Sequence, residues 1–227
     1  MVPMATRPQQ SPRRTDALSK ERIVEAAIEM LDAGGEKALT FRGLAARLAT
    51  GSGAIYWHVA NKDELLAAAT DDVIARVVTD VAEDAEPRAA IRAMALGVFD
   101  AIDVHPWAGV QLSRRPWLAA LPQLFEGFGG QLEALGVPER LLFDSTSALV
   151  GHVLGAAGQN AANGRLYAQG ADRAAVLGSV AEEWARLDPE RFPFVHRVAA
   201  QLPEHDDRDQ FLTGVDLFVT GIVAARA

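Results

Sequence analysis

The chain of 227 residues contains no cysteine, which excludes disulfides, thiolate nucleophiles, zinc–thiolate sites and iron–sulfur clusters, and a reducing compartment is the simplest setting. Its first residues, 1–18, carry arginines but no apolar run of the kind found in secretion signals. The most apolar late stretch, 211–225, is too short to cross a bilayer and contains Asp216, which predicts a buried helix. We therefore expect a cytoplasmic protein with no membrane partner.

The sequence also lacks the usual catalytic signatures. It has no G-x-S-x-G elbow, no P-loop and no G-x-G-x-x-G motif. Its five histidines show neither the H-x-x-x-H nor the H-E-x-x-H spacing of metal sites. Asp144, Ser145 and His152 fall on one predicted helix at spacings that do not assemble a triad. We predict no enzyme activity, no catalytic residue, no metal site and no cofactor.

Charge is distributed unevenly along the chain, whose net charge is −8. Residues 1–62 hold nine Lys/Arg against six Asp/Glu, whereas residues 63–227 hold thirteen against twenty-four, and all three lysines lie at or before Lys62. Binding to phosphates needs local positive potential, so this asymmetry favours a nucleic-acid-binding N-terminal end and an acidic body held away from it. Random variation of surface charge is the alternative interpretation.

Apolar spacing predicts helices throughout and no sustained two-residue alternation, so the expected fold is all-α. Residues 1–18 have no apolar period and are predicted to be a disordered basic arm. Ser19 is the predicted N-cap of a first helix that ends at Gly34 and Gly35. Thr40 then caps a second helix ending near Ala49. After Pro87, X-Pro pairs predict helix boundaries. The predicted helices span about 87–104, 106–114, 121–135, 139–163, 172–187, 190–201 and 207–225.

Residues 39–66 carry the functional motif, which is a helix, a tight turn, a second helix at about 52–58 and the capped start of a further helix at 62–84. Asn61 and Glu64, three positions apart, form the capping-box-like start of that last helix. This order of elements is typical of a helix-turn-helix, whose second helix enters the major groove of DNA. Three apolar residues fill the small core between the two helices, namely Leu44, Leu48 and Ile55.

At these residues the sequence resembles the TetR family of transcriptional regulators, most clearly through Ile55-Tyr-Trp-His-Val59 followed by Asn61-Lys62. The resemblance implies a DNA-binding domain at 19–65 and a helical ligand-binding and dimerisation domain at 66–227. It implies a dimeric regulator, by family analogy a repressor, that binds an inverted-repeat operator. The residues implied to hold phosphates are Thr40, Tyr56, His58 and Lys62. Those implied to approach base edges are Arg42, Ser52, Gly53, Ala54 and Trp57.

The turn departs from the family pattern. Where the family usually has Gly-Val-Ser, this chain has Ala49-Thr50-Gly51, so the usual serine cap is absent. We expect Thr50 or Ser52 to cap the recognition helix instead, and we count Thr50 among the DNA-binding residues.

An effector site is expected between helices 87–135 and 139–163, where aromatic residues occur with a few polar groups. Apolar walls with sparse polar groups are typical of a pocket for a small, mostly apolar organic molecule. His105 matches the position that in tetracycline repressors helps to hold a magnesium-bound drug, but the family's glutamate is replaced by Gln159 or Asn160, which argues against that ligand. A helix-capping role for His105 stays open, as does a plain core role for the aromatics. The predicted lining is Phe99, His105, Trp107, Gln111, Trp117, Phe125, Phe128, Gln159 and Asn160.

Two helices are predicted to form a homodimer interface. Helix 139–163 offers small residues for close approach, and helix 207–225 contributes apolar side chains. The alternative is that both helices only fill their own core. A small all-α enzyme or carrier for an apolar compound remains the other candidate function, and it would need a titratable cluster in its pocket.

Overall fold

The computed structural model describes residues 18–80, 85–114, 120–167 and 172–225. Every regular element in these ranges is a helix, which confirms the predicted all-α fold. The predicted N-terminal arm lies almost entirely outside the described residues, and so does Trp117.

Three helices and the start of a fourth build the N-terminal unit, residues 19–65, which we call the head. Helix α1 (Lys20–Ala38) begins at the predicted cap, where Ser19 Oγ accepts from the Arg22 amide at 3.3 Å. The predicted stop at Gly34 and Gly35 is confirmed as the point where the regular helix is interrupted, although the element continues beyond it. Gly35 adopts φ 65°, which kinks the helix, and helical turns resume as far as Ala38. The chain bends here because a glycine takes a left-handed conformation at little cost.

The second and fourth helices start where their caps predict. Helix α2 (Phe41–Arg47) begins after Thr40, whose Oγ1 accepts from the Gly43 amide at 3.1 Å. Helix α4 (Lys62–Thr79) begins after Asn61, whose Oδ1 accepts from the Glu64 amide at 2.8 Å. Glu64 in turn accepts from the Ala60 amide at 2.9 Å, so the predicted reciprocal capping box is present with a one-residue shift. The helix ends at Thr79 rather than at 84.

The body, residues 85–225, follows the predicted boundaries closely. It contains α5 (Pro87–Val104), α6 (Pro106–Arg114), α7 (Ala120–Ala134), α8 (Glu139–Tyr167), α9 (Arg173–Ala185) and α11 (Asp207–Ala224). The single helix expected at 190–201 is wrong, because two elements occupy that stretch. These are α10 (Pro193–Val198) and a 3₁₀ helix, η2 (Ala199–Glu204), whose tighter turn accommodates Pro203.

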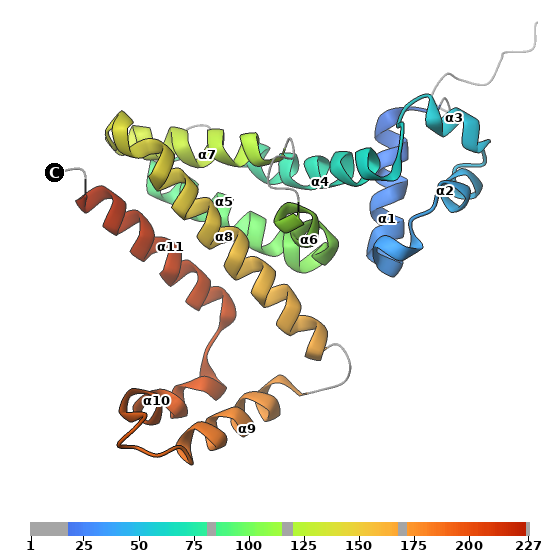
Figure 1. Ribbon diagram of the computed structural model, residues 1–227. Coiled ribbons are helices and arrows are strands. Elements are labelled where there is room, and N and C mark those ends of the chain that lie inside the picture. The colour runs from blue at the N-terminus through green and yellow to red at the C-terminus, as the bar shows by residue number, and fades with distance from the viewer. Residues whose placement is uncertain (1–17, 81–84, 115–119, 168–171, 226–227) are drawn as a thin grey trace, which may run out of the picture.

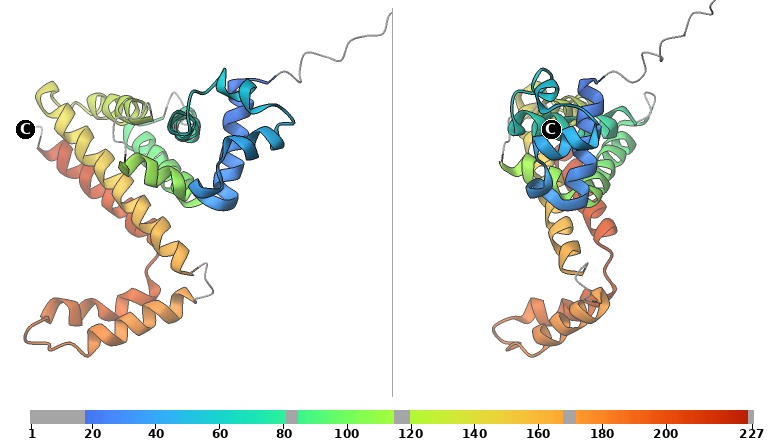
Figure 2. Two further views of the ribbon diagram at one scale, coloured as in Figure 1. Left: turned by 45° about the vertical axis from the view of Figure 1, so that its right-hand side comes forward. Right: turned by 90° about the vertical axis from the view of Figure 1, so that its right-hand side faces the viewer.

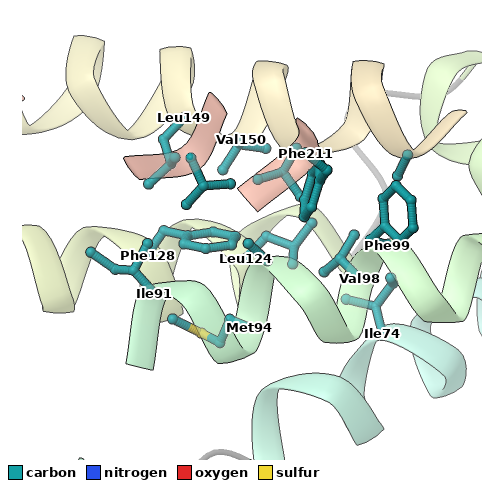
Figure 3. Close-up of a cluster of buried hydrophobic side chains, with 14 of the residues drawn as sticks. Ile74, Ile91, Met94, Val98, Phe99, Leu124, Phe128, Leu149, Val150 and Phe211 are labelled. Carbon is teal, nitrogen blue, oxygen red and sulfur yellow. The ribbon is translucent and has the colours of Figure 1, made fainter. Parts of the chain in front are cut away.

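The core of the body lies between α4, α5, α7, α8 and α11 (Figure 3). Phe128 and Leu124 of α7 have no exposed surface, and Phe99 of α5 packs against Phe211 of α11 with ring centroids 4.7 Å apart. By length and composition α8 could cross a membrane, but it packs against α5, α6, α7 and α11. These contacts cover only part of the helix, since 28% of its most apolar stretch is buried.

Two parts of the chain project from the body in different directions (Figure 1). Helices α2 and α3 (Ser52–Tyr56) lie at one end, beyond α1 and the start of α4, and α4 leads from there into the body. Helices α9 and α10 with η2 pack on one another and extend from the ends of α8 and α11, as all views show (Figure 2). The head is thus presented away from the rest of the molecule.

Candidate DNA interface and effector site

The predicted DNA-binding residues fall on the N-cap and first turn of α2, the turn after α2, α3 itself, the turn after α3 and the first residue of α4. Trp57 and His58 are the two residues in the turn after α3. Trp57, at the C-cap of α3, is the most exposed large apolar residue of the described chain, with 90% of its surface accessible. Arg42, in the first turn of α2, is also exposed. The exposure of the indole is unusual because large apolar side chains are normally buried, whereas an exposed guanidinium is common.

The recognition helix α3 (Ser52–Tyr56) has only five residues. The expectation that Thr50 or Ser52 caps it is wrong. Gly51 occupies the N-cap position and offers no side-chain acceptor. The chain reaches this position through Ala49, which takes φ 50° in the left-handed region where glycine is the usual residue. Ile55 holds the helix from the inside, since its side chain is completely buried in the head core.

Tyr56 and Lys62 have partners within the head. The Tyr56 ring stacks on Phe41 of α2, with ring centroids 4.5 Å apart and planes 9° from parallel. Lys62 Nζ donates to the main-chain carbonyl of Glu36 at 2.5 Å, near the C-terminal end of α1. That position favours a cation because helix carbonyls carry partial negative charge. An ammonium has three donors, so this contact leaves Lys62 capacity for a phosphate.

Sequence reasoning missed the junction between the head and the body. Asp32 of α1 accepts from Trp107 Nε1 at 2.7 Å, and the same carboxylate oxygen lies 2.7 Å from His105 Nδ1. Trp107 is buried in the hydrophobic core of the head, together with Ala108. The first turn of α6 is therefore part of the head core, and α6 connects the two units directly.

A second carboxylate of α1 extends this junction. Glu36 Oε2 accepts from Gln111 Nε2 at 3.3 Å and from Arg114 at 3.4 Å. The Glu36 and Arg114 side chains are substantially exposed, so this ion pair adds little stability by itself. Together with Asp32 it aligns one face of α6 along α1.

An adjacent face of α6 borders a cleft of about 350 Å³ between α5, α6 and α8. Its walls are mostly apolar, with Ser113 and Arg114 as polar members. The cleft is open because α6 and α8 carry small residues on its walls. The helical spacing of these small residues is the sequence signal that could have predicted the cleft. The lining is Ile102, Pro106, Gly109, Val110, Ser113, Arg114, Leu154, Gly155, Gly158, Ala161 and Ala162.

The structure does not gather the predicted ligand residues around this cleft, although the cleft lies between the expected helices. Phe99 and Phe128 are buried in the body core, and Phe125 packs at its edge against Phe143. His105, Trp107 and Gln111 face α1 instead. On α8, Gln159 is exposed and Asn160 donates to Asp103 at 3.2 Å. The described aromatics that were predicted as pocket walls are core or junction residues, because burial of large rings stabilises a helical bundle.

Comparisons with known proteins agree with this architecture of a helix-turn-helix head on a helical body. The family model described as bacterial regulatory proteins, tetR family, matches residues 23–69. The solved structure of a transcriptional regulator of Streptomyces coelicolor, described as a TetR protein, is 51% identical with a TM-score of 0.85. That comparison covers 93% of this chain and 100% of the other. The chain therefore belongs to the TetR family of transcriptional regulators.

Two curated relatives are similar over part of their length. The HTH-type transcriptional repressor DrrR1 of Streptomyces coeruleorubidus is 34% identical over 188 residues, which are 81% of this chain and 66% of the relative. An HTH-type transcriptional regulator of Saccharopolyspora erythraea is 36% identical over 110 residues. That match covers 48% of this chain and 47% of the relative, so the chain spans about half the length of that protein.

Proposed function

We propose that this protein is a ligand-responsive transcriptional repressor that binds an inverted-repeat operator as a dimer and leaves it when a small, mostly apolar molecule binds. The observation that carries the DNA-binding part is the nearly complete exposure of Trp57 beside α3, at an end of the molecule that also presents Arg42. A relative of the same fold, BioQ, 29% identical with a TM-score of 0.57, has been solved with its double-stranded DNA operator. A regulator of this kind acts in the bacterial cytoplasm.

The ten predicted residues keep their proposed roles at this interface. Thr40, Tyr56, His58 and Lys62 bind phosphates and set the register of the head on DNA. Arg42 and Trp57 reach base edges, with Ser52, Gly53 and Ala54 close to them, and Thr50 lies in the turn. Contacts to phosphates weaken with salt and do not depend on sequence, whereas contacts to bases decide which duplex is preferred.

Binding to selected duplexes tests these roles. After selection of a duplex from a random pool, Lys62→Ala should weaken all duplexes alike and lower the salt dependence, while Arg42→Ala or Trp57→Ala should change the preferred half-site. Lys37→Ala, an exposed lysine of α1, is the charge-matched control. Melting temperatures are compared because Lys62 also contacts Glu36. Unchanged affinity and salt dependence for Lys62→Ala would refute its phosphate role.

Dimerisation is supported by the outer faces of α8 and α11. Only 28% of the most apolar stretch of α8 is buried, and α11 exposes 69% of Leu217 and 38% of Phe218. These helices border an apolar groove of about 530 Å³. A second copy of the chain would cover these surfaces by two-fold symmetry and present two recognition helices to successive major grooves. Leu217→Glu should yield monomers in sedimentation, and a wild-type monomer at micromolar concentration would contradict the proposal.

The effector site is the cleft between α5, α6 and α8, whose volume is suitable for a small organic molecule. A ligand there would press on α6, whose other face holds α1 through Asp32, and α4 provides the second connection to the head. A tenfold loss of operator affinity requires about 1.4 kcal/mol of coupling.

Filling the cleft tests the effector site. A Cβ at Gly158 would meet no atom within 4 Å, so Gly158→Leu should fold and occupy the space. Wild-type protein is screened for compounds that raise its melting temperature and release the selected duplex. Gly158→Leu should still bind DNA but lose both responses, and a retained response would place the effector elsewhere. The enzyme or carrier alternative is disfavoured because the relatives are named as regulators.

A further inference from the structure

Phe41 and Tyr56 form a parallel aromatic stack across the turn of the helix-turn-helix, with ring centroids 4.5 Å apart. We propose that Phe41 is a positioning residue for DNA binding, which holds the Tyr56 phenol in the orientation that contacts the DNA backbone. This inference rests on the proposed DNA-binding function. Phe41 was not among the residues that the sequence assigned to the interface.

The recognition helix needs such support because its own ends supply little. A helix of five residues is not stable alone, since the first turn costs more entropy than its few hydrogen bonds return. Its N-cap, Gly51, makes no side-chain hydrogen bond, and Ala49 ahead of it is in the left-handed region. Ile55 fixes the inner face in the head core. On the outer face, the stack with Phe41 holds Tyr56 against α2.

The stack restricts a side chain that is otherwise free to move. More than half of the Tyr56 surface, 53%, is accessible, so an unstacked phenol would populate several rotamers. Ordering a mobile side chain on binding typically reduces affinity by roughly two- to tenfold. A ring held in advance avoids this loss. Phe41 itself lies between Thr40 and Arg42 in the first turn of α2, so one residue connects α2 and α3 at the DNA-facing end.

A purely structural role for Phe41 would require only an apolar side chain of similar size. Phe41 is half-buried against the head core, and leucine would supply similar apolar contact there. Only a planar ring can stack in parallel on Tyr56. Phe41→Leu therefore separates stacking from packing, and Phe41→Tyr, which keeps the ring, is the matched conservative variant.

The experiment measures binding of the full chain to a mixed-sequence duplex of roughly 30 base pairs, about three helical turns, at low salt. A phosphate contact is detectable on such a duplex without knowledge of the operator. Phe41→Leu should bind roughly two- to tenfold more weakly than wild type, with only a small fall in melting temperature, because leucine keeps the apolar contact and loses the stacking. Phe41→Tyr, which keeps the ring, should retain the affinity of the wild type. The aromatic proton shifts of Tyr56 in NMR spectra should move in Phe41→Leu and not in Phe41→Tyr.

A double-mutant cycle then links the effect to Tyr56. Tyr56→Phe removes the hydroxyl and keeps the stack, so it should weaken binding in the wild type and have a smaller effect in Phe41→Leu. Equal affinity of Phe41→Leu and wild type, or strictly additive effects of the two changes, would overturn the inference. If wild-type protein binds no duplex at all, the DNA-binding function itself fails, which is a distinct outcome.

Discussion

The head and the body bury their apolar side chains in different ways. The body core includes residues of α4, α5, α7, α8 and α11, and its largest members, such as Phe128, are fully buried. The head core is smaller and is completed by Trp107 and Ala108, which belong to α6. Leu112, one turn further along the same helix, joins the body core. The head therefore depends on α6 for its own packing, whereas the body core contains no residue of α1, α2 or α3.

This asymmetry is suited to a switch. A change in the body that moves α6 alters the surface on which the head is packed. It also moves the α6 side chains that donate hydrogen bonds to Asp32 and Glu36 of α1. Movement of α6 would therefore disturb the packing of the head, because packed cores tolerate displacement poorly. Substitutions in the two regions should therefore differ in how much they change the stability of each region.

Truncation of a central body residue should have the largest effect. Phe128 has no exposed surface, so Phe128→Ala should lower the free energy of unfolding by about 3–5 kcal/mol through lost burial and a cavity. Chemical denaturation followed by circular dichroism measures this change. Phe143→Ala is the matched control, since 71% of Phe143 is exposed and its loss should cost little. Equal effects of the two changes would contradict the assignment of the body core.

Loss of the hydrogen bonds at the junction should lower the free energy of unfolding by a smaller amount. The effect should be largest in the head. Asp32→Ala leaves Trp107 Nε1 and His105 Nδ1 without their shared acceptor, and we expect a loss of about 1–3 kcal/mol. Hydrogen exchange should show reduced protection in α1 and α2 and nearly unchanged protection in α8. Glu25→Ala, at an exposed position of the same helix, is the control. Equal loss of protection in head and body would mean that the two are one cooperative unit.

Relief of backbone strain should stabilise the head modestly. Ala49 adopts φ 50°, a conformation that costs an alanine about 1 kcal/mol or more and a glycine little. Ala49→Gly should therefore raise the free energy of unfolding of the head by up to about 1 kcal/mol. Ala46→Gly, at an exposed helical position of α2, should lower it by a similar amount. The same sign for both substitutions would exclude strain as the cause.

The sequence predicted local features well, because they depend on neighbours along the chain. Thr40 and Asn61 cap their helices as expected, and the X-Pro pairs at Pro106 and Pro138 mark helix starts of the body. Pro122 and Pro203, in contrast, lie inside α7 and η2. The cap of α3 was predicted wrongly because the chain has no suitable side chain at Gly51 and tertiary packing of Ile55 compensates. A local signal cannot reveal that compensation.

Contacts between distant parts of the chain were the main features that sequence patterns did not give. His105 was interpreted as a ligand-binding or capping residue, and it lies against Asp32, 73 positions away. Trp107 has the same apolar spacing whether it faces a pocket or another unit, so periodicity cannot distinguish the two. Only the position of α1 relative to α6 decides it, and that position is set by the whole fold.

The smallest expected effect concerns the contact of α4 with the body. Asp71 of α4 accepts from the Ala120 amide at the start of α7 at 2.6 Å. Partial burial raises the pKa of the Asp71 carboxyl, and the hydrogen bond from Ala120 offsets only part of that rise. The folded protein thus holds this proton more tightly than the unfolded chain. The resulting stabilisation is complete below the unfolded pKa, about 3.9, and is lost as the pH rises through the folded pKa.

Asp71→Asn removes this ionisation and keeps an acceptor for Ala120. The variant should therefore be slightly more stable than wild type at pH 7, and the difference should shrink as the pH falls toward about 4. Denaturation of both proteins across this range measures the difference, with Glu133→Gln, an exposed carboxylate of α7, as the control. A difference that grows on acidification would show that the ionised carboxylate stabilises the α4–α7 contact. In that case α4 would be attached to the body by charge, and the head would be released more readily in acid.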